Sequence, residues 1–418
     1  MSARITTLPN GLRVISETME HVETASVGVW VEAGARFEAP EINGVTHLLE
    51  HMTFKGTETR SAQALVEEIE DVGGQINAYT TRETTAYYAK MLKEDLGLAV
   101  DVVADLVQNA VLDEDELKKE RAVVVQEINQ SFDTPDDIIY DHFQETVFPE
   151  QAVGRPVLGT EDRVMNMPRQ AVMDYMTHHY TPANMVLAAA GNLNHDELVD
   201  LAQTHFQTAK ETTPAPQDPA RYIGGDFRHK RDLEQVHLLM GFEGVPYEDD
   251  EVYAASVLAT LLGGGMSSRL FQEIREKRGL VYSIYAYGSS YTDAGLFGIY
   301  AGTSEKELAE LVPVTCDEIN KTLTGLSEDE VARARAQMKA STLMSLESTS
   351  SRAEQLARQL MVYGRPLEIA EVIAKIDAVD AAQAEAVARR IFSTTPTLAA
   401  IGPVGALENY DTFKGRFN

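Results

Sequence analysis

Residues 47–51 read His-Leu-Leu-Glu-His, and their types and spacing point to chemistry more directly than any other part of the chain. Positions four apart lie on one face of a helix, so His47 and His51 can offer ring nitrogens to one metal ion, with Glu50 beside them. A zinc ion held by two imidazoles needs a third protein ligand and leaves a position for water, whose proton a neighbouring carboxylate can accept. The pattern favours metal-assisted hydrolysis. A buried helix whose histidines and glutamate hydrogen-bond one another is the competing explanation.

A third ligand is offered by the segment 113–130, which predicts a helix that opens with Asp113 and Glu116 at the spacing of a capping box. Glu120 and Glu127 are seven residues apart and therefore share a face of this helix. Glu127 lies within an apolar stretch, where a buried carboxylate needs a partner. The residues alone leave two partners open, a metal ion and a salt bridge.

These motifs together resemble the pitrilysin/insulinase-type zinc metallopeptidases, whose inverted motif runs His-x-x-Glu-His. Within that family the likeness is strongest to the β subunit of the mitochondrial processing peptidase and its short bacterial relatives. It is dense in the N-terminal half and thinner in the C-terminal half. The segments that carry it are 8–12 (LPNGL), 44–57 (GVTHLLEHMTFKGT), 77–83 (NAYTTRE) and the pair of glutamates at 120 and 127.

The resemblance implies a zinc endopeptidase with one zinc ion per chain. It assigns Glu127 as the third metal ligand beside His47 and His51, and Glu120 as its accessory acidic partner. Glu50 would take the proton of the attacking water and later protonate the leaving amine. Substrates would be extended, unfolded and basic peptides, since an enclosed chamber of this kind excludes folded proteins by size.

Three residues near the motif are candidates for binding the peptide. The resemblance places Phe54 beside the cleavage point, although a core aromatic would explain it equally well. Residues 73–80 predict a turn followed by a short strand, and a strand edge can bind an extended peptide through its main chain. In the family this strand holds substrate, which assigns Asn77 and Ala78 to binding and leaves structural roles to Tyr79 and Thr80.

Four further residues are assigned by the resemblance. Asp137 and Asp141 match acidic residues that hold a substrate arginine, a contact that needs a positioned carboxylate; helix capping and loop solvation are the alternatives. Arg275 and Tyr282, seven apart, match a pair that faces the zinc and binds the carbonyl side of the substrate. The competing explanation is that Arg275 and Tyr282 are surface residues whose spacing has no functional meaning.

The organisation of the chain indicates an internal duplication. A polar, proline-rich segment near the midpoint marks a linker at 210–225 between domains 1–209 and 226–418. Residues 112–117 are echoed by residues 326–331, and a helical stretch precedes each. Alternation predicts strands at 26–31 and 84–92, and helices are expected near 43–54, 61–72, 95–110 and 113–132. We expect two α+β domains with largely antiparallel sheets, the second lacking the metal site.

Composition limits the partners. The 418 residues include 36 basic and 65 acidic ones, a net charge of −29, which argues against nucleic acid or an anionic membrane surface. No apolar run is long enough to span a bilayer and the N-terminus lacks the apolar core of a secretory signal, so a cytoplasmic protein is expected. Cys316, the single cysteine, fits a small core residue better than a nucleophile.

The resemblance also implies an assembly. Longer family members supply four such domains in one chain, whereas this chain has two, so a homodimer is expected with Arg275 and Tyr282 of one subunit facing the zinc of the other. A heterodimer with a related subunit stays open. Two alternative functions belong to other classes: a non-catalytic assembly subunit and a protein that holds peptides without cutting them. The complete motif argues against both.

Overall fold

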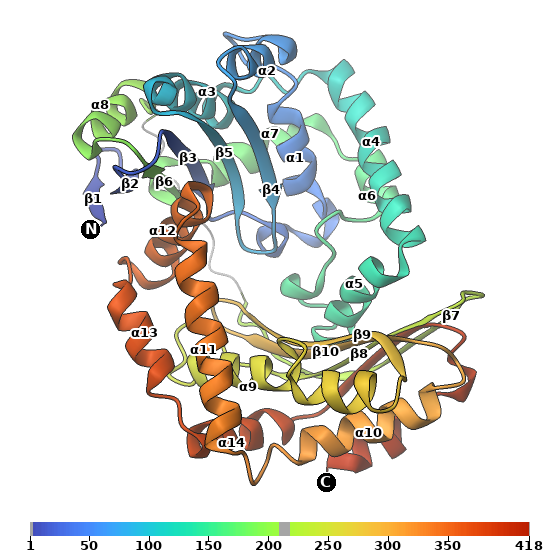
Figure 1. The fold of residues 1–418 in the computed structure, drawn as a ribbon. Coiled ribbons are helices and arrows are strands. Elements are labelled where there is room, and N and C mark those ends of the chain that lie inside the picture. Colours follow the sequence, from blue (N-terminus) through green and yellow to red (C-terminus); the bar gives the residue numbers. More distant parts are fainter. Residues whose placement is uncertain (1–2, 209–217, 418) are drawn as a thin grey trace. The chain divides into compact units, whose positions relative to one another are not determined.

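The computed structural model describes residues 3–208 and 218–417 (Figure 1). The chain divides into two compact units, and each unit contains one β-sheet. Unit 1 comprises Met1–Asn129, Arg155–Asp218 and Leu343–Glu368, and unit 2 comprises Gln130–Gly154, Pro219–Thr342 and Ile369–Asn418. The first half of the predicted linker, residues 210–217, lies outside the described residues. The domain limits at 209 and 226 therefore stay a prediction.

The sheet of unit 1 has six strands and ends at the strand that follows the metal motif. Its order is β1 (Arg4–Thr7), β2 (Arg13–Thr18), β6 (Met185–Gly191), β3 (Thr24–Val31), β5 (Thr85–Leu92) and β4 (Gln75–Thr80). Only β2 and β6 run parallel, and every other neighbouring pair is antiparallel. β4 pairs with β5 alone among the described strands, so its other edge has no strand neighbour there, and Ala78 N donates to the side chain of Asn77 at 2.8 Å.

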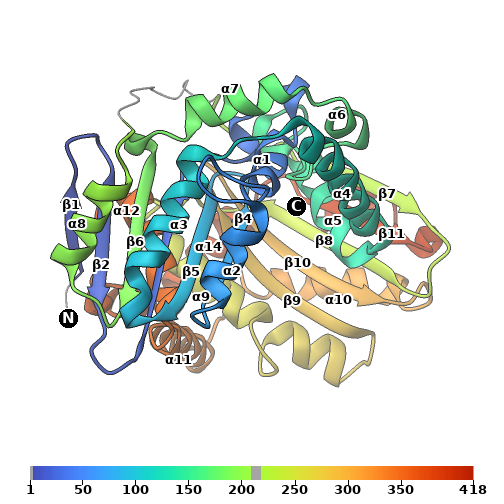
Figure 2. The same cartoon turned by 90° about the horizontal axis from the view of Figure 1, so that it is seen from above.

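Helices cover both faces of this sheet (Figures 1 and 2). One face packs against α3 (Leu96–Asn109), α8 (His195–His205) and α1 (Val45–Thr53). The opposite face packs against α12 (Thr349–Tyr363), where Trp30 and Leu356 belong to one apolar cluster. The unit also contains α2 (Ala62–Glu70), α6 (Glu161–Met165) and α7 (Arg169–His179), while α4 runs over Glu114–Asp133.

The sheet of unit 2 repeats the topology of the first. Its order is β7 (Gly225–Lys230), β11 (Thr397–Gly402), β8 (Val236–Glu243), β10 (Gly295–Thr303) and β9 (Val281–Ser290). β7 and β11 are parallel and the rest antiparallel, which is the pattern of β2, β6, β3, β5 and β4 in the same chain order. Its helices are α5 (Pro135–Val147), α9 (Val252–Gly263), α10 (Leu308–Asn320), α11 (Glu328–Ser345), α13 (Ile369–Asp377), α14 (Ala381–Phe392) and α15 (Tyr410–Lys414). The expected duplication of an α+β unit is confirmed.

Each unit contains one helix that comes from the half of the sequence that forms the other unit. The sequence analysis did not predict this exchange of helices. Helix α5 comes from the first half and packs on β11, β8 and β7 of unit 2. Helix α12 comes from the second half and packs on β6, β3 and β2 of unit 1. In the described part of the chain, none of the helices has the length and apolar character required to cross a membrane.

Candidate metal centre

Helix α1, which carries the histidines, starts from a tightly held N-terminus. Gly44 precedes it with a φ of +97°, in the left-handed region that favours glycine. The buried carboxylate of Glu38 accepts hydrogen bonds from Gly44 N (2.9 Å), Thr46 N (2.8 Å) and Asn43 Nδ2 (2.8 Å). It thereby satisfies backbone donors that the first turn of a helix leaves open. Burial raises the pKa of Glu38 despite these bonds.

The two histidines face one carboxylate oxygen from a different helix. His47 Nε2 lies 3.6 Å and His51 Nε2 lies 3.5 Å from the same Oε2 of Glu127, on α4. The two imidazole rings are 4.7 Å apart between centroids. One candidate ligand atom from each of the three residues lies within 4.8 Å of the others, and no second such group occurs in residues 3–208 and 218–417.

This arrangement fits a zinc ion. Three ligands at the usual distance of about 2 Å in a tetrahedron would be about 3.3 Å apart, close to the separations found here. Burial, and then the charge of His51, lowers the pKa of His47 to about 3, so its imidazole is neutral and can offer a lone pair. Its Nδ1 is buried and has no hydrogen-bond partner among the described residues.

The orientation of His51 is fixed by a second glutamate from α4. Oε2 of Glu120 lies 3.0 Å from His51 Nδ1, and Lys55 Nζ lies 2.7 Å from the other oxygen of Glu120. If the proton of the neutral imidazole is on Nδ1 and is donated to Glu120, then Nε2 carries the lone pair. This lone pair is directed toward Glu127. Glu120 has only 5% of its surface exposed and contacts the centre through His51.

Glu50 is held by the edge strand. Thr80 Oγ1, on β4, donates a 2.5 Å hydrogen bond to Glu50 Oε2. Burial raises the pKa of Glu50, and the hydrogen bond from Thr80 opposes this increase. The carboxylate next to the histidines is thus oriented by a residue of the strand that carries Asn77 and Ala78.

Three of the predicted substrate-binding residues line one hollow beside His51. Phe54 follows α1, and its ring centroid lies 6.3 Å from that of Tyr87. With Asn77 and Ala78 of β4 it lines a hollow of about 440 Å³. The same hollow is lined by Glu50, His51, Lys55, Val66, Glu70, Gly74, Gln75, Ile76 and Glu120.

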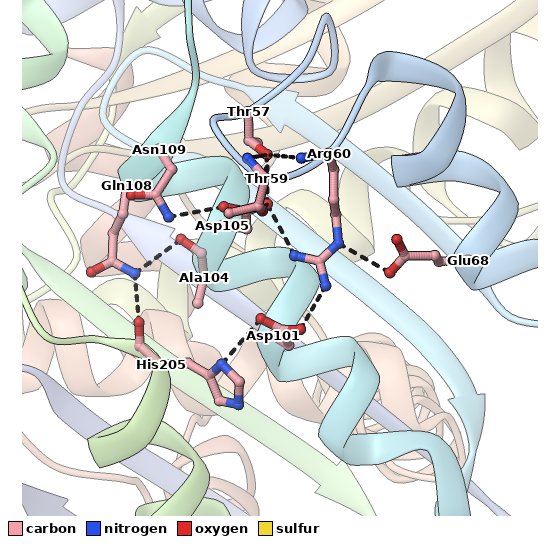
Figure 3. A network of polar contacts seen from close by, with 10 residues as sticks. All are labelled: Thr57, Thr59, Arg60, Glu68, Asp101, Ala104, Asp105, Gln108, Asn109 and His205. Atoms are coloured by element: carbon pink, nitrogen blue, oxygen red, sulfur yellow. Dashed lines mark hydrogen bonds and ion pairs between the residues drawn. The ribbon is translucent and has the colours of Figure 1, made fainter.

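The loop after α1 is anchored to α3 by a polar network (Figure 3). Arg60 is paired with Asp105 (3.0 Å), Asp101 (2.6 Å) and Glu68 (3.0 Å). Thr57 and Thr59 also donate to Asp105. Burial would raise the pKa of Asp105, but hydrogen bonds from these threonines, Asn109 and Arg60 outweigh it and lower the pKa. The network holds the chain that connects α1 to α2.

The remaining predicted residues belong to unit 2. Asp137 lies in the first turn of α5 and accepts a hydrogen bond of 2.7 Å from Ser131 Oγ, and Asp141 is one turn further on. Arg275, in the π-helical segment Phe271–Glu276, places its guanidinium 5.3 Å from the ring centroid of Tyr282. Tyr282 is 79% exposed. The roles of all four in substrate binding stay predictions.

Three residues that shape the centre were not identified from the sequence. The sequence pattern predicts a structural role for Thr80 and indicates no role at the centre for Lys55 or Glu38. Lys55 follows His51 by four positions, a spacing that could have placed it beside the same glutamate. Glu38 and Thr80 reach α1 from other segments, and no local spacing signals such contacts.

Comparison with known proteins identifies the family of this chain. Residues 13–161 match the family model described as insulinase (peptidase family M16), and residues 166–338 match the model described as the peptidase M16 inactive domain. The chain belongs to peptidase family M16. The second match agrees with a duplicated half in which the described residues hold no second metal-ligand group.

Relatives of this M16 protein extend over most of its length. An "uncharacterized zinc protease" of Rickettsia felis is 40% identical over 403 residues, which cover 96% of this chain and 97% of the relative. The "probable mitochondrial-processing peptidase subunit beta" of Arabidopsis thaliana is 39% identical over 429 residues, or 99% of this chain and 81% of the relative. A chain of complex III2 from Candida albicans has the same fold, with a TM-score of 0.89, 24% identity and 99% coverage of both chains.

Proposed function

We propose that this M16 protein is a zinc endopeptidase that binds one zinc ion per chain through His47, His51 and Glu127. The observation that carries the proposal is the position of one Glu127 oxygen 3.6 and 3.5 Å from the Nε2 atoms of the two histidines. A zinc ion bound there would acidify a water molecule and polarise the carbonyl group to be cleaved.

The protein side chains then have separate tasks in peptide hydrolysis. Glu50 is next to the ligands on α1 and accepts the proton of the attacking water, which it later delivers to the leaving amine. Thr80 holds the carboxylate in one orientation through its 2.5 Å hydrogen bond. Glu120 fixes the ring of His51, and Lys55 balances the charge of Glu120 at 2.7 Å.

The free edge of β4 supplies a binding surface for an extended peptide. A strand added to this edge would form main-chain hydrogen bonds that make few demands on sequence. Its path would run past Asn77 and Ala78, with one side chain in the hollow beside Phe54. This favours unfolded segments as substrates. The net charge of −29 favours basic ones.

We infer further that the working form is a dimer that encloses the site in a chamber. Tyr282 is 79% exposed and its ring packs against Arg275, which leaves a cationic and a phenolic donor together on the surface of unit 2. Donors of this kind stabilise the oxyanion of a tetrahedral intermediate. A second copy of the chain, or a related subunit, would bring them to the zinc site.

A non-catalytic assembly subunit is the alternative function. The similarity to a complex III chain, at 24% identity, supports the shared fold alone. The ligand group, Glu50 and the edge strand are all present in this chain, as peptide hydrolysis requires.

Metal analysis combined with a cleavage assay tests the function. The purified protein should contain one zinc ion per chain and cut an unstructured basic peptide, and a chelator should abolish cleavage. Glu127→Gln should lose zinc, whereas Glu50→Gln should keep zinc and lose turnover. Full zinc in the Glu127 variant would remove that residue from the ligand set, and the absence of cleavage by the zinc-loaded protein would favour the assembly subunit.

A further inference from the structure

A second, smaller hollow lies on the other face of the unit 1 sheet, between the strands and α12. It measures about 130 Å³ and is lined by the rings of Trp30, Tyr79 and Tyr88 and by Glu354. Ser26 and Ser350 contribute to its wall. The mechanism described above uses none of these residues.

The walls of this hollow are held in place by hydrogen bonds. Trp30 Nε1 donates to the hydroxyl of Tyr79 at 3.0 Å, and that hydroxyl donates to Glu354 Oε1 at 3.1 Å. The rings of Tyr79 and Tyr88 are 6.0 Å apart between centroids and tilted by 56°. Glu354 is exposed to solvent. The hollow therefore combines three aromatic side chains with one carboxylate.

Such a set of groups is suited to a cation. Aromatic faces attract ammonium and guanidinium groups, and a carboxylate adds a charge-assisted hydrogen bond. Arg358 lies one turn after Glu354 on α12 and contributes a charge of the opposite sign. Burial is the main cause of the raised pKa of Tyr79, and the charge of Glu354 raises this pKa further. The charge of Arg358 opposes the increase and is the smallest of these contributions.

The position of the hollow relates it to the proposed peptide strand. Along β4, Ala78 lines the hollow of Phe54 and Thr80 contacts Glu50, whereas Tyr79 points to the α12 face. Side chains of a paired strand alternate in the same way. If one substrate side chain enters the hollow of Phe54, its neighbours in the peptide project to the face of Tyr79.

Distance adds a requirement on the length of that neighbouring side chain. An added strand would lie about 4.8 Å from β4. Tyr88 is on β5 and Trp30 on β3, one and two strands further into the sheet. Arginine and lysine, with stems of several methylene groups, are the cationic side chains that extend furthest from the edge toward these rings, and Tyr79 on β4 is the ring they meet first.

We propose that this hollow, here called the tyrosine pocket (Trp30, Tyr79, Tyr88 and Glu354), binds the arginine or lysine side chain of a substrate residue adjacent to the one beside Phe54. The proposal rests on the proposed peptidase function and names a determinant of its specificity. The tyrosine pocket selects for positive charge on the face of the peptide strand opposite to the hollow of Phe54.

Paired peptides test the tyrosine pocket. An otherwise uncharged fluorogenic peptide carries a single arginine, or its uncharged isostere citrulline, at successive positions around the cut. The wild-type protein should prefer arginine by about tenfold in kcat/KM at a position next to the residue beside Phe54. In Glu354→Gln this ratio should fall close to one. Arg358→Gln is the matched control, and it should keep or increase the ratio.

Each outcome bears on a different statement. If Glu354→Gln keeps the preference for arginine, or lowers kcat/KM equally for both peptides, the tyrosine pocket is not the cation site. If the wild-type protein cuts neither peptide, the proposed function fails, and the pocket is then judged from the Kd values of the two peptides. A preference for arginine in binding that Glu354→Gln removes would support the pocket even then, and equal Kd values would reject it.

Discussion

Thr80 donates a hydrogen bond of 2.5 Å to Glu50, so the edge strand β4 and the metal-motif helix α1 are joined at the residue assigned to proton transfer. Asn77 and Ala78, on the same strand, line the hollow in which a substrate side chain would lie. A peptide that pairs with β4 therefore adds to the element that also orients Glu50. Binding and proton transfer share one structural support.

Removal of the Thr80 hydroxyl should lower turnover without loss of metal. Thr80→Val keeps the shape of the side chain, but Glu50 is no longer fixed relative to the attacking water. We expect kcat to fall by roughly tenfold with unchanged zinc content. Thr80→Ser retains the donor and serves as the control. A zinc-loaded Thr80→Val protein with full kcat would show that the hydrogen bond does not matter for proton transfer.

Replacement of Glu120 should weaken zinc binding. In Glu120→Ala, His51 Nδ1 loses the carboxylate at 3.0 Å that fixes the orientation of the ring. Changes of this type lower metal affinity by about 10- to 100-fold. Competition with a chromogenic chelator measures the effect. Lys55→Met is the control, since it removes the partner of Glu120 but leaves the contact to His51, and equal losses in both variants would contradict the orienting role.

The network around Arg60 should contribute strongly to stability. Arg60 and Asp105 are both largely buried, with side-chain exposures of 13% and 4%. Removing one partner of a buried pair leaves an uncompensated charge, so Arg60→Met should lower the free energy of unfolding by about 3 kcal/mol. Denaturant unfolding measures this value. Addition of Asp105→Asn to Arg60→Met should recover part of the loss, and strict additivity would show that the two side chains are not coupled.

The same network predicts a pH dependence. Because the pKa of Asp105 is lowered from 3.8 in the folded protein, its ionised form stabilises the fold above that value. This contribution is lost as the pH falls through the lowered pKa. The difference in the free energy of unfolding between wild type and Asp105→Asn should therefore shrink below about pH 4. A difference that stays constant down to the acid transition would reject this assignment.

Mixing two inactive variants tests the dimer. Glu50→Gln lacks the proton acceptor and Tyr282→Phe lacks the phenolic donor, so neither homodimer should turn over peptide. A hybrid dimer has one site with both groups intact if Tyr282 acts on the zinc of the other subunit. We expect partial recovery of activity on mixing. The lack of recovery in hybrids confirmed by mass spectrometry would place both groups in the same chain.

The sequence predicted the parts of the centre that follow a local period. The spacing put His47 and His51 on one helix face and Glu120 and Glu127 on another, the family resemblance joined them into one site, and the structure brings those side chains together. The α+β duplication was also predicted, because the alternation and helical runs recur in both halves. The roles of the two histidines and the two glutamates in zinc binding and catalysis stay proposals.

Contacts between distant segments were not accessible in the same way. Thr80 reaches Glu50 only because β4 pairs at the edge of the sheet beside α1, and Glu38 caps α1 from a loop. The exchange of α5 and α12 between the units depends on which sheet the apolar face of each helix fits. The sequence of each helix shows only the pattern of an ordinary amphipathic helix, so it does not indicate which sheet the helix packs on. Such pairings are decided by tertiary packing.

The helix α12 has a consequence for how the protein is made. Unit 1 includes Leu343–Glu368, so during synthesis its sheet forms without the helix that covers Trp30 and its neighbours. Unit 1 can therefore finish folding only after this segment has been translated. A gene cut at the midpoint would yield two fragments that each lack a helix, and they would have to be expressed together to regain a complete unit 1.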